Sequence, residues 1–188
     1  MEKRKVAFVT GASRGIGRAC AIALAESGYD VAVTARTMVD GTAFLDDGKT
    51  LVPGGLDTTV EKIRAAGQEG FAIEMDLLDR NSVLQGADAA LQHFGHIDVL
   101  LNNAIYQGPG SMLTIEELED GYLNSLFEGN VFAHLALIRY LLPTFIHQGG
   151  ATIINMISAT AFTDPPGKIG SGGWGAGYAM SKSAFERI

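Results

Sequence analysis

Five short apolar segments alternate along this chain with longer segments whose apolar residues recur at helical spacing. The five segments are nearly continuous in apolar residues, and they cover 5–10, 30–35, 70–74, 97–102 and 152–157. Strands buried on both faces have this pattern, because helices cover the two sides of a parallel sheet. The intervening segments predict helices at 15–27, 56–66, 79–94 and 115–142, and a last helix that begins near Gly177. We therefore expect a doubly wound parallel α/β domain of Rossmann type, built from right-handed βαβ units with strand order 3-2-1-4-5.

The ends of the predicted helices carry stop signals. A glycine follows each of the first three helices, and these glycines are Gly28, Gly67 and Gly95. Pro143 is expected to end the fourth helix at residue 142, because proline has no N–H to continue the hydrogen-bond ladder. Two long glycine-rich loops, at 37–55 and 163–177, are of the kind that is usually functional or mobile in a compact domain.

Composition narrows the class of protein. A length of 188 residues and an apolar fraction of 47% predict a single domain with a sizeable core. The net charge of −7 argues against a broad surface for nucleic acid or for an anionic membrane, although a few arginines suffice for one phosphate site. Cys20 is the single cysteine, so no internal disulfide forms, and its apolar helical surroundings indicate a buried structural thiol.

No segment predicts a signal peptide, a membrane span or a metal site. The apolar stretch after the basic N-terminus is too short for a signal peptide, and residues 131–146 include Arg139 and Pro143, which do not suit a bilayer. The four histidines, at 93, 96, 134 and 147, lack metal-ligand spacing and are interpreted as ordinary surface or core residues. We therefore expect a soluble cytoplasmic protein.

A glycine-rich turn at 10–17, Thr-Gly-Ala-Ser-Arg-Gly-Ile-Gly, joins the first predicted strand to the first predicted helix. Gly11 permits a tight turn, Gly15 lets the backbone approach a pyrophosphate, and Gly17 allows close packing of helix on strand. The N–H groups and the positive dipole end of the helix then face the anion. The alternative is a strand–helix turn without a ligand, but the strand, turn and helix in register favour a dinucleotide site.

Two arginines favour NADP over NAD. An NAD site often has a carboxylate at the end of the second strand, where it binds the ribose 2′-hydroxyl. Here that strand is followed by Arg36, and Arg14 lies inside the glycine turn. Two guanidinium groups that converge on the ribose would suit a 2′-phosphate. The alternatives are two solvated surface arginines and an enzyme that uses NAD.

Tyr178 and Lys182 predict an acid–base pair. At i and i+4 on a helix they share one face. A tyrosine pKa near 10 is too high for easy proton exchange at neutral pH, and lowering it to about 7 takes roughly 4 kcal/mol of differential stabilisation. A neighbouring ammonium supplies part of this by favouring the phenolate, and an oxidised nicotinamide could add to the field.

Two further polar residues are candidates for the same site. Ser158 lies at the end of the fifth strand, at the sheet edge where open α/β folds bind ligands, and its hydroxyl could hold a substrate oxygen. Thr160 and Ser181 are alternative hydroxyls. Asn130 lies within the long fourth helix, where an amide indicates either a local kink or a site that holds water.

These motifs resemble those of the short-chain dehydrogenase/reductase family, and the resemblance covers essentially all 188 residues. The turn at 10–17 is similar to the family's TGxxxGxG, the segment at 102–105 to its NNAG, and the segment at 178–182 to its YxxSK. The resemblance implies a catalytic tetrad of Asn130, Ser158, Tyr178 and Lys182. It implies that the cofactor contacts Gly11, Ser13, Arg14, Gly15, Ile16, Gly17, Arg36, Asp76, Leu77, Asn103, Ala104, Tyr178 and Lys182, with Asp76 beside the adenine.

The family mechanism then gives each residue of the tetrad a role. In the direction of reduction, Tyr178 donates the proton to the carbonyl oxygen that Ser158 orients. Lys182 holds the nicotinamide ribose and lowers the pKa of Tyr178, and Asn130 anchors a water that relays protons to Lys182. The resemblance also implies a homo-oligomer, either a dimer or a tetramer.

Three departures from the family pattern stand out. Ile105 replaces the glycine of NNAG and is expected to crowd the floor of the nicotinamide site. Ser158 and Tyr178 are separated by about seven residues more than is usual, and the additional loop, with Trp174, is expected to wall the substrate pocket. The family continues beyond the tyrosine helix with further strands and a substrate-covering segment. We therefore expect the sequence to be an incomplete nucleotide-binding domain, part of a longer chain, with an open edge at its fifth strand.

The sequence thus predicts an NADP(H)-dependent oxidoreductase that interconverts a secondary alcohol and a ketone. The alternative from another class is a catalytically inactive NADP-binding regulatory or interaction protein. The substrate is not identified by the sequence, because the residues that shape its pocket lie in the long loop and in the segment expected to follow.

Overall fold

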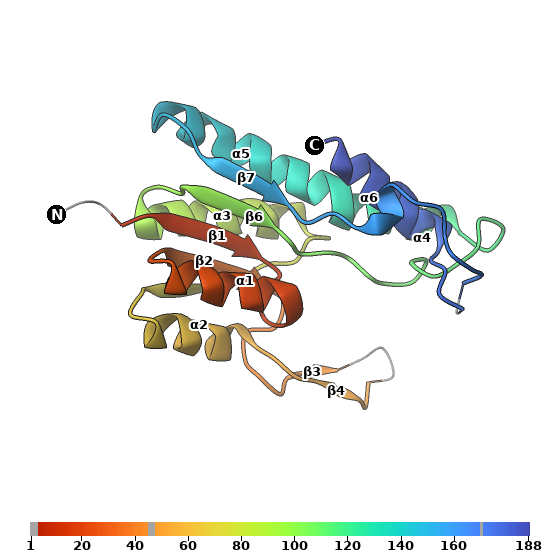
Figure 1. Cartoon of the computed structure of the whole chain (residues 1–188), viewed down its shortest axis with the longest axis horizontal. Coiled ribbons are helices and arrows are strands. Elements are labelled where there is room, and N and C mark those ends of the chain that lie inside the picture. The colour runs from red at the N-terminus through yellow and green to blue at the C-terminus, as the bar shows by residue number, and fades with distance from the viewer. Residues whose placement is uncertain (1–3, 45–47, 170) are drawn as a thin grey trace.

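The computed structural model describes residues 4–44, 48–169 and 171–188, and its centre is a parallel sheet (Figure 1). The strands, in chain order, are β1 (Val6–Thr10), β2 (Asp30–Ala35), β5 (Gly70–Glu74), β6 (Val99–Asn102) and β7 (Thr152–Asn155). They lie side by side in the order β5-β2-β1-β6-β7, which confirms the predicted order 3-2-1-4-5. The register places Val9 of β1 between Val33 of β2 and Leu101 of β6.

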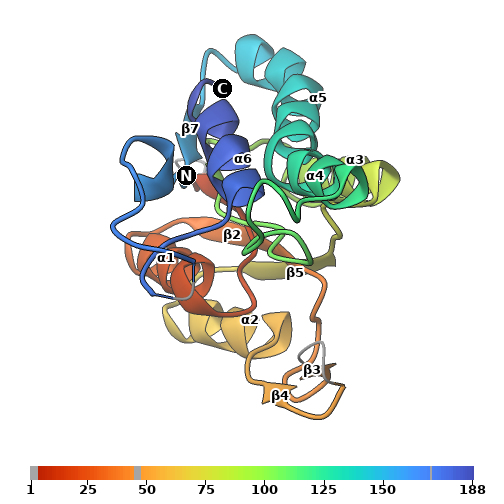
Figure 2. The same ribbon diagram turned by 90° about the vertical axis from the view of Figure 1, so that its right-hand side faces the viewer.

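Helices cover both faces of this sheet (Figure 2). They are α1 (Gly15–Glu26), α2 (Leu56–Ala65), α3 (Arg80–Phe94), α4 (Asp120–Phe127), α5 (Ala133–His147) and α6 (Ala176–Glu186). Buried residues of α1 and α2 form one apolar cluster with β1 and β2, and those of α3 and α5 form another on the opposite face. The fold is therefore the predicted doubly wound, Rossmann-like arrangement.

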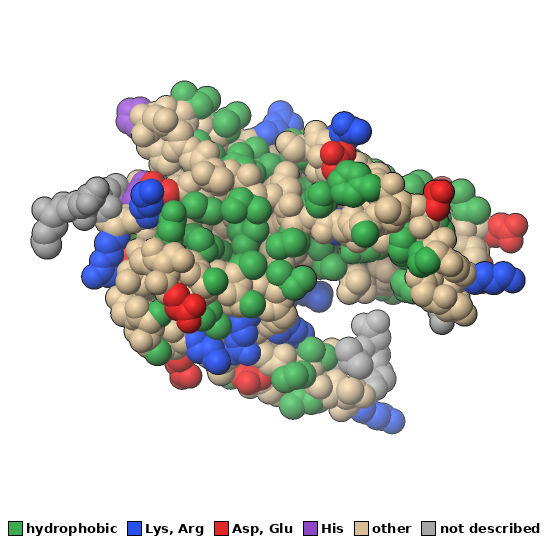
Figure 3. Space-filling view, in the orientation of Figure 1, with side chains coloured by type: hydrophobic (Ala, Val, Ile, Leu, Met, Phe, Trp, Pro, Cys, Tyr) green, Lys and Arg blue, Asp and Glu red, His purple; other side chains and the backbone are tan. Residues whose placement is uncertain are grey.

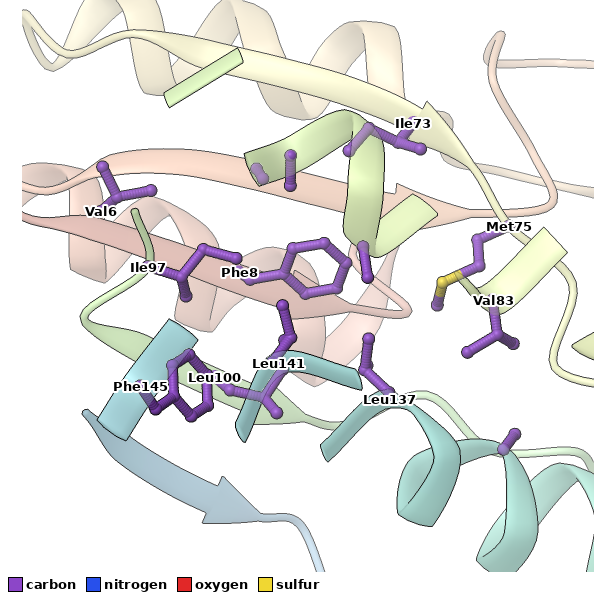
Figure 4. Close-up of a cluster of buried hydrophobic side chains, with 14 of the residues drawn as sticks. Val6, Phe8, Ile73, Met75, Val83, Ile97, Leu100, Leu137, Leu141 and Phe145 are labelled. Atoms are coloured by element: carbon purple, nitrogen blue, oxygen red, sulfur yellow. The ribbon is translucent and has the colours of Figure 1, made fainter. Parts of the chain in front are cut away.

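Successive strand residues alternate between the two clusters. Phe8 and Leu100 point toward α3 and α5, where they meet Leu141 and Phe145 (Figure 4). Val9, the next residue along β1, belongs to the cluster on the other face. Burying a side chain such as Phe8 stabilises the fold by roughly 1.5–3 kcal/mol, so the two clusters hold the strand ends, and the loops that follow them, in fixed positions.

The fourth predicted helix differs from expectation at both ends. It begins at Asp120 rather than at 115, and it continues through Pro143 to His147, so the prediction that Pro143 ends it is wrong. Pro143 is exposed, so water can satisfy the Arg139 carbonyl that lacks its helical donor. Leu141 and Phe145, on the opposite side, stay packed in the core and keep the helix on the sheet.

The helical run has a π-helical segment, Glu128–Phe132, between α4 and α5. Together these elements form a run of 28 residues, Asp120–His147, which by length and composition alone would be apolar enough to cross a membrane. The expectation of no membrane span was based on residues 131–146 alone, whereas the apolar helical run begins at Asp120. In the structure, Leu137, Leu141 and Phe145 of this run pack into the core beside the sheet.

The loop at 37–55 contains a small hairpin that was not predicted. Strands β3 (Ala43–Phe44) and β4 (Leu51–Val52) pair antiparallel and project from the body of the molecule (Figure 1). Residues 45–47 of this loop, and residue 170 of the loop at 163–177, lie outside the described residues. The base of the hairpin is closed by the N–H of Leu56, which donates to the Thr37 carbonyl at 3.1 Å.

Strand β7 forms one edge of the sheet, as expected. Ile153 and Ile154 point to opposite faces of it and are 38% and 44% exposed. In Figure 3, hydrophobic side chains gather on the face where β7 and α1 lie. Both sides of this edge strand are thus open in the described part of the chain.

Candidate active site

The predicted site residues gather where the strands end. All five strands point the same way, and the loops that follow them share one edge with α4 and α6 (Figures 1 and 2). This carboxyl edge is where open α/β sheets bind ligands.

The glycine turn has the shape that the sequence predicted. Gly11 has a φ of 69°, and a Cβ there would lie 2.8 Å from the Cα of Ala104. Gly15 has a φ of 57°, and no described atom lies within 4 Å of the position its Cβ would take. The backbone is therefore bare and open at Gly15, where a phosphate would approach the start of α1. Ser13 is buried beneath the turn, and Ile16 is 62% exposed on its outer side.

Thr10 and Asn103 join this turn to the one that follows β6. The Thr10 hydroxyl accepts hydrogen bonds from the N–H groups of Asn103, at 2.9 Å, and Ala104, at 3.0 Å. The Asn103 side chain donates to the carbonyls of Thr10, at 2.9 Å, and Gly11, at 3.3 Å. Thr10 was not among the predicted site residues, although a hydroxyl at the last position of a buried strand is a signal that could have identified it.

Arg36 follows β2, and Arg14, in the glycine turn after β1, reaches toward the same place through its side chain. Arg14 Nη2 donates to the Thr37 hydroxyl at 3.0 Å and to the Gly54 carbonyl at 3.1 Å, so the hairpin loop orients it. Arg36 is exposed at the end of β2, next to Thr37. Among the ion pairs of the described residues, none involves Arg14 or Arg36, so no carboxylate in that part of the chain neutralises either charge. The pair suits a phosphate.

Asp76 and Leu77 follow β5, the neighbour of β2 in the sheet. One Asp76 carboxylate oxygen accepts from the N–H of Leu78 at 2.9 Å, which fixes the side chain in a local turn. Leu77 is 8% exposed and belongs to the core. Asp76 is thus at the carboxyl edge, whereas Leu77 offers its backbone more readily than its side chain to a ligand.

Helix α6 places Tyr178 and Lys182 on one side of the sheet edge. Lys182 is 2% exposed, and its ammonium donates to the Met156 carbonyl at 3.0 Å. The ammonium also lies 5.2 Å from the centre of the Phe185 ring. Burial lowers the pKa of Lys182 from 10.5 to about 8, so the residue keeps its charge near neutrality but holds it weakly. Tyr178, one turn earlier, is half-buried.

Ser158 precedes a short 3₁₀ segment, Ala159–Ala161, that packs against α6. Its hydroxyl accepts from the Thr160 N–H at 3.4 Å, and the side chain is half-buried. Among the hydrogen bonds of the described residues, none joins Ser158 to Tyr178. The alternative Ser181 hydroxyl is buried and already bonded to Asn130 and to the Tyr178 carbonyl, and the Thr160 hydroxyl is buried, which leaves Ser158 as the candidate with an accessible oxygen.

Asn130 lies in the π-helical segment and is fully buried. Its side-chain oxygen accepts from the N–H of Tyr106 at 2.7 Å, and its nitrogen donates to the Tyr106 carbonyl, at 3.2 Å, and the Ser181 hydroxyl, at 3.1 Å. Both amide hydrogens are therefore committed, so the side chain can hold a relay water only through its oxygen. The structure places Asn130 as a link between the loop after β6 and α6.

His134 is a polar core residue whose surroundings were not foreseen. It is 1% exposed, with Nε2 at 2.9 Å from the Ala104 carbonyl oxygen and Nδ1 at 3.3 Å from the Asn102 side-chain oxygen. Burial lowers the pKa of His134 to about 4, the Ala104 carbonyl opposes this shift, and the charge of Lys182 adds to it. The ring is neutral at pH 7. Its position four residues after Asn130, on the same helical face, is the sequence signal that could have revealed it.

The long loop before α6 rests on the loop after β6. The N–H of Ala176 donates to the Leu113 carbonyl at 3.2 Å, and a Cβ on Gly175 would lie 2.3 Å from the Ser111 carbonyl oxygen. Trp174 is half-buried beside this contact. Ile105, which replaces the expected glycine, is 37% exposed on the loop after β6.

Comparison with known proteins identifies the family. The family model described as short chain dehydrogenase matches residues 5–187. The chain is 31% identical over 189 residues to the 3-oxoacyl-(acyl-carrier-protein) reductase FabG of Staphylococcus aureus, covering 100% of this chain and 70% of that protein. The chain therefore belongs to the short-chain dehydrogenase/reductase family.

Solved structures share the fold. A metagenomic short-chain oxidoreductase in complex with NADP is 30% identical, with a TM-score of 0.77 over 97% of this chain and 72% of that one. The NADH-dependent reductase A1-R′ complexed with NAD is 25% identical, with a TM-score of 0.74 over 96% of this chain and 68% of that one. Across the curated relatives compared, the chain spans 60% to 70% of their length, and across the solved structures 58% to 72%.

Proposed function

We propose that this oxidoreductase uses NADP(H) to interconvert a secondary alcohol and a ketone, with Tyr178 as the general acid and base. The observation that carries the proposal is the Lys182 ammonium, held beneath the site at 2% exposure with a carbonyl as its hydrogen-bond partner. A lysine is rarely buried without a carboxylate, because desolvation of its charge is costly. Its place one turn from Tyr178 supports a role in stabilising a phenolate.

The residues of the chain divide the chemistry between them. When bound, a nicotinamide cofactor supplies or accepts hydride at the substrate carbon. In the direction of reduction, Tyr178 donates its hydroxyl proton to the carbonyl oxygen, and in oxidation its phenolate accepts that proton back. Ser158 orients the oxygen, Lys182 holds the ribose and favours the phenolate, and Asn130 fixes α6 through Ser181.

Tyr178→Phe tests the reaction. The variant keeps the aromatic ring and removes the hydroxyl that donates the proton. We therefore expect NADPH binding within about threefold of wild type. Turnover on a panel of ketones should fall by about 100-fold or more. Tyr140→Phe is a matched control, because it removes an exposed hydroxyl of α5 that donates to Asp88 of α3. Turnover retained in Tyr178→Phe would overturn the role of Tyr178. Absence of turnover in the wild type with tight NADPH binding would favour the inactive NADP-binding protein.

The choice of NADP rests on Arg14 and Arg36, which no carboxylate among the described residues pairs. Arg36→Asp should weaken NADPH binding by about 10- to 100-fold, because a hydrogen bond to a charged group contributes about 1.5–3 kcal/mol. It should leave NADH binding nearly unchanged. Arg64→Asp, which makes the same charge change on an exposed turn of α2, is the control. Equal losses for the two cofactors in Arg36→Asp would favour NAD as the cofactor.

We further propose that residues 1–188 act as one nucleotide-binding domain, in the cytoplasm and in a homo-oligomer. The exposed face of the helical run supports the oligomer, because Phe132, just before α5, and Ile146, near its end, are 45% and 71% exposed. The net charge of −7 supports a small-molecule substrate rather than nucleic acid or an anionic membrane.

A further inference from the structure

Asn130 and His134 both connect the loop after β6 to helix α6. They lie four residues apart along the helical run, and both are buried, at 0% and 1% exposure. Asn130 bonds to Tyr106 after β6 and to Ser181 of α6. His134 bonds to the Ala104 carbonyl after β6 and, on its other side, meets the ring of Phe185 of α6, with ring centres 4.8 Å apart.

Phe185 transmits the position of His134 to Lys182. Its side chain is fully buried, with its ring against the His134 imidazole and 5.2 Å from the Lys182 ammonium. The interior is close-packed, so a ring held on one side cannot shift without moving what rests on its other side. The place of the ammonium therefore depends on the imidazole.

Ala104 connects His134 to the glycine turn at the opposite end. Its N–H donates to the Thr10 hydroxyl at 3.0 Å, and its Cα lies 2.8 Å from where a Gly11 Cβ would be. The His134 imidazole holds the carbonyl of this same residue at 2.9 Å. The His134 side chain thus contacts both Ala104, in the turn after β6, and Phe185, which packs against the Lys182 ammonium.

The contact with the Ala104 carbonyl explains a histidine at this depth. A neutral imidazole has one N–H, and a carbonyl oxygen only accepts, so Nε2 carries the hydrogen and donates to Ala104. Nδ1 is left beside the Asn102 amide, 3.3 Å from its oxygen. An apolar side chain of similar size would fill the space but would leave the Ala104 carbonyl without this donor.

We propose that His134 is a positioning residue that fixes the separation between the turn after β6 and helix α6, and so places the Lys182 ammonium beside the bound cofactor. This inference rests on the proposed function. It assigns a role to a residue outside the Asn-Ser-Tyr-Lys tetrad, and it predicts that cofactor binding depends on the N–H donor and not only on the volume of the side chain.

The test compares His134→Leu with His134→Gln by NADPH titration, followed through cofactor fluorescence, and by thermal unfolding. Leucine removes the donor and keeps the bulk, and glutamine keeps an N–H donor within reach of Ala104. We expect NADPH affinity to fall about tenfold in His134→Leu, because the displaced Lys182 ammonium loses its contact with the cofactor, and to recover to within about threefold of wild type in His134→Gln. Leu137→Val is the control, because Leu137 lies on the same helix at the same 1% exposure without a polar contact.

The outcomes separate the two proposals. NADPH affinity that falls in His134→Leu, recovers in His134→Gln and stays unchanged in Leu137→Val supports the positioning role, whatever the change in melting temperature. If His134→Leu lowers only the melting temperature, as Leu137→Val does, His134 is a packing residue and the inference is wrong. If the wild type binds neither NADPH nor NADH, the proposed function itself is overturned.

Discussion

Gly17→Ala is the sharpest test of the close packing between helix α1 and the glycine turn. Gly17 lies in the first turn of α1, and a Cβ there would lie 2.3 Å from the Gly11 carbonyl oxygen and 2.4 Å from Asn103 Nδ2. The first neighbour is backbone, which cannot rotate away. The second is the amide that ties the glycine turn to the turn after β6. The methyl group therefore forces the two turns apart.

The magnitude follows from three contributions. Replacing glycine by alanine within a helix stabilises it by about 1 kcal/mol when the new methyl has room. Overpacking costs roughly 1–3 kcal/mol, and loss of an Asn103 hydrogen bond costs about 1 kcal/mol more. The net effect on Gly17→Ala is a destabilisation of about 2 kcal/mol. For a chain of this size that corresponds to a fall in melting temperature of about 4–8 °C.

The effect is measured by thermal unfolding and NADPH titration of two variants, each with alanine in place of a helical glycine. Gly121→Ala is the control, because Gly121 lies in α4 with no described atom within 4 Å of its Cβ position. We expect Gly121→Ala to raise the melting temperature by about 2–4 °C and to bind NADPH like the wild type. Gly17→Ala should melt lower and bind NADPH at least about tenfold more weakly, because its turn no longer presents the start of α1.

One result would refute this reasoning. If Gly17→Ala were as stable as Gly121→Ala and bound NADPH equally well, the close approach of α1 to the two turns would not exist in solution. If Gly17→Ala lost stability but bound NADPH like the wild type, the contact of Gly17 with the two turns would stabilise the fold without shaping the cofactor site.

Further predictions concern buried ionisable groups and the helix proline. Burial lowers the pKa of Lys182 from 10.5 to about 8. Between these values the unfolded chain binds more protons at this site, so the free energy of unfolding should rise with pH there, and Lys182→Met should flatten that rise in urea titrations. The pKa of His134 falls from 6.5 to about 4. Its contribution to stability is therefore lost as the pH falls through this window, and melting curves of His134→Gln should show a smaller loss. Pro143→Ala should raise the melting temperature by about 2–4 °C, because it supplies the missing N–H at an exposed helical position, and an unchanged melting temperature would show that solvent already satisfies the Arg139 carbonyl.

The sheet and its order were predictable because each strand is a short apolar segment between helices. Burial on both faces imposes that pattern directly on the sequence. The glycine turn was predictable for a related reason, since Gly11 and Gly15 both require a backbone conformation that other residues rarely adopt. Helix breaks were less predictable. Pro143 is tolerated because it faces water, and its exposure depends on tertiary packing that local sequence does not encode.

The connections inside the site were beyond sequence reasoning. Asn130 was recognised as unusual in a helix, but its bonds to Tyr106 and Ser181 depend on two segments that are distant in the sequence. His134 was interpreted as an ordinary surface or core residue for the same reason. Its partners, Ala104 after β6 and Phe185 of α6, are distant from it in the sequence and meet it only after folding.

The contact between the loop before α6 and the loop after β6 gives the molecule an intrinsic optical probe. Trp174 is the only tryptophan in the sequence, and it sits where Gly175 closes against Ser111 at the carboxyl edge of the sheet. Its emission therefore reports on one place rather than on an average over the fold. Because tryptophan emits where reduced nicotinamide absorbs, cofactor entering that edge would quench this emission by energy transfer. Loop opening and cofactor arrival could then be followed in a stopped-flow instrument without attaching any label.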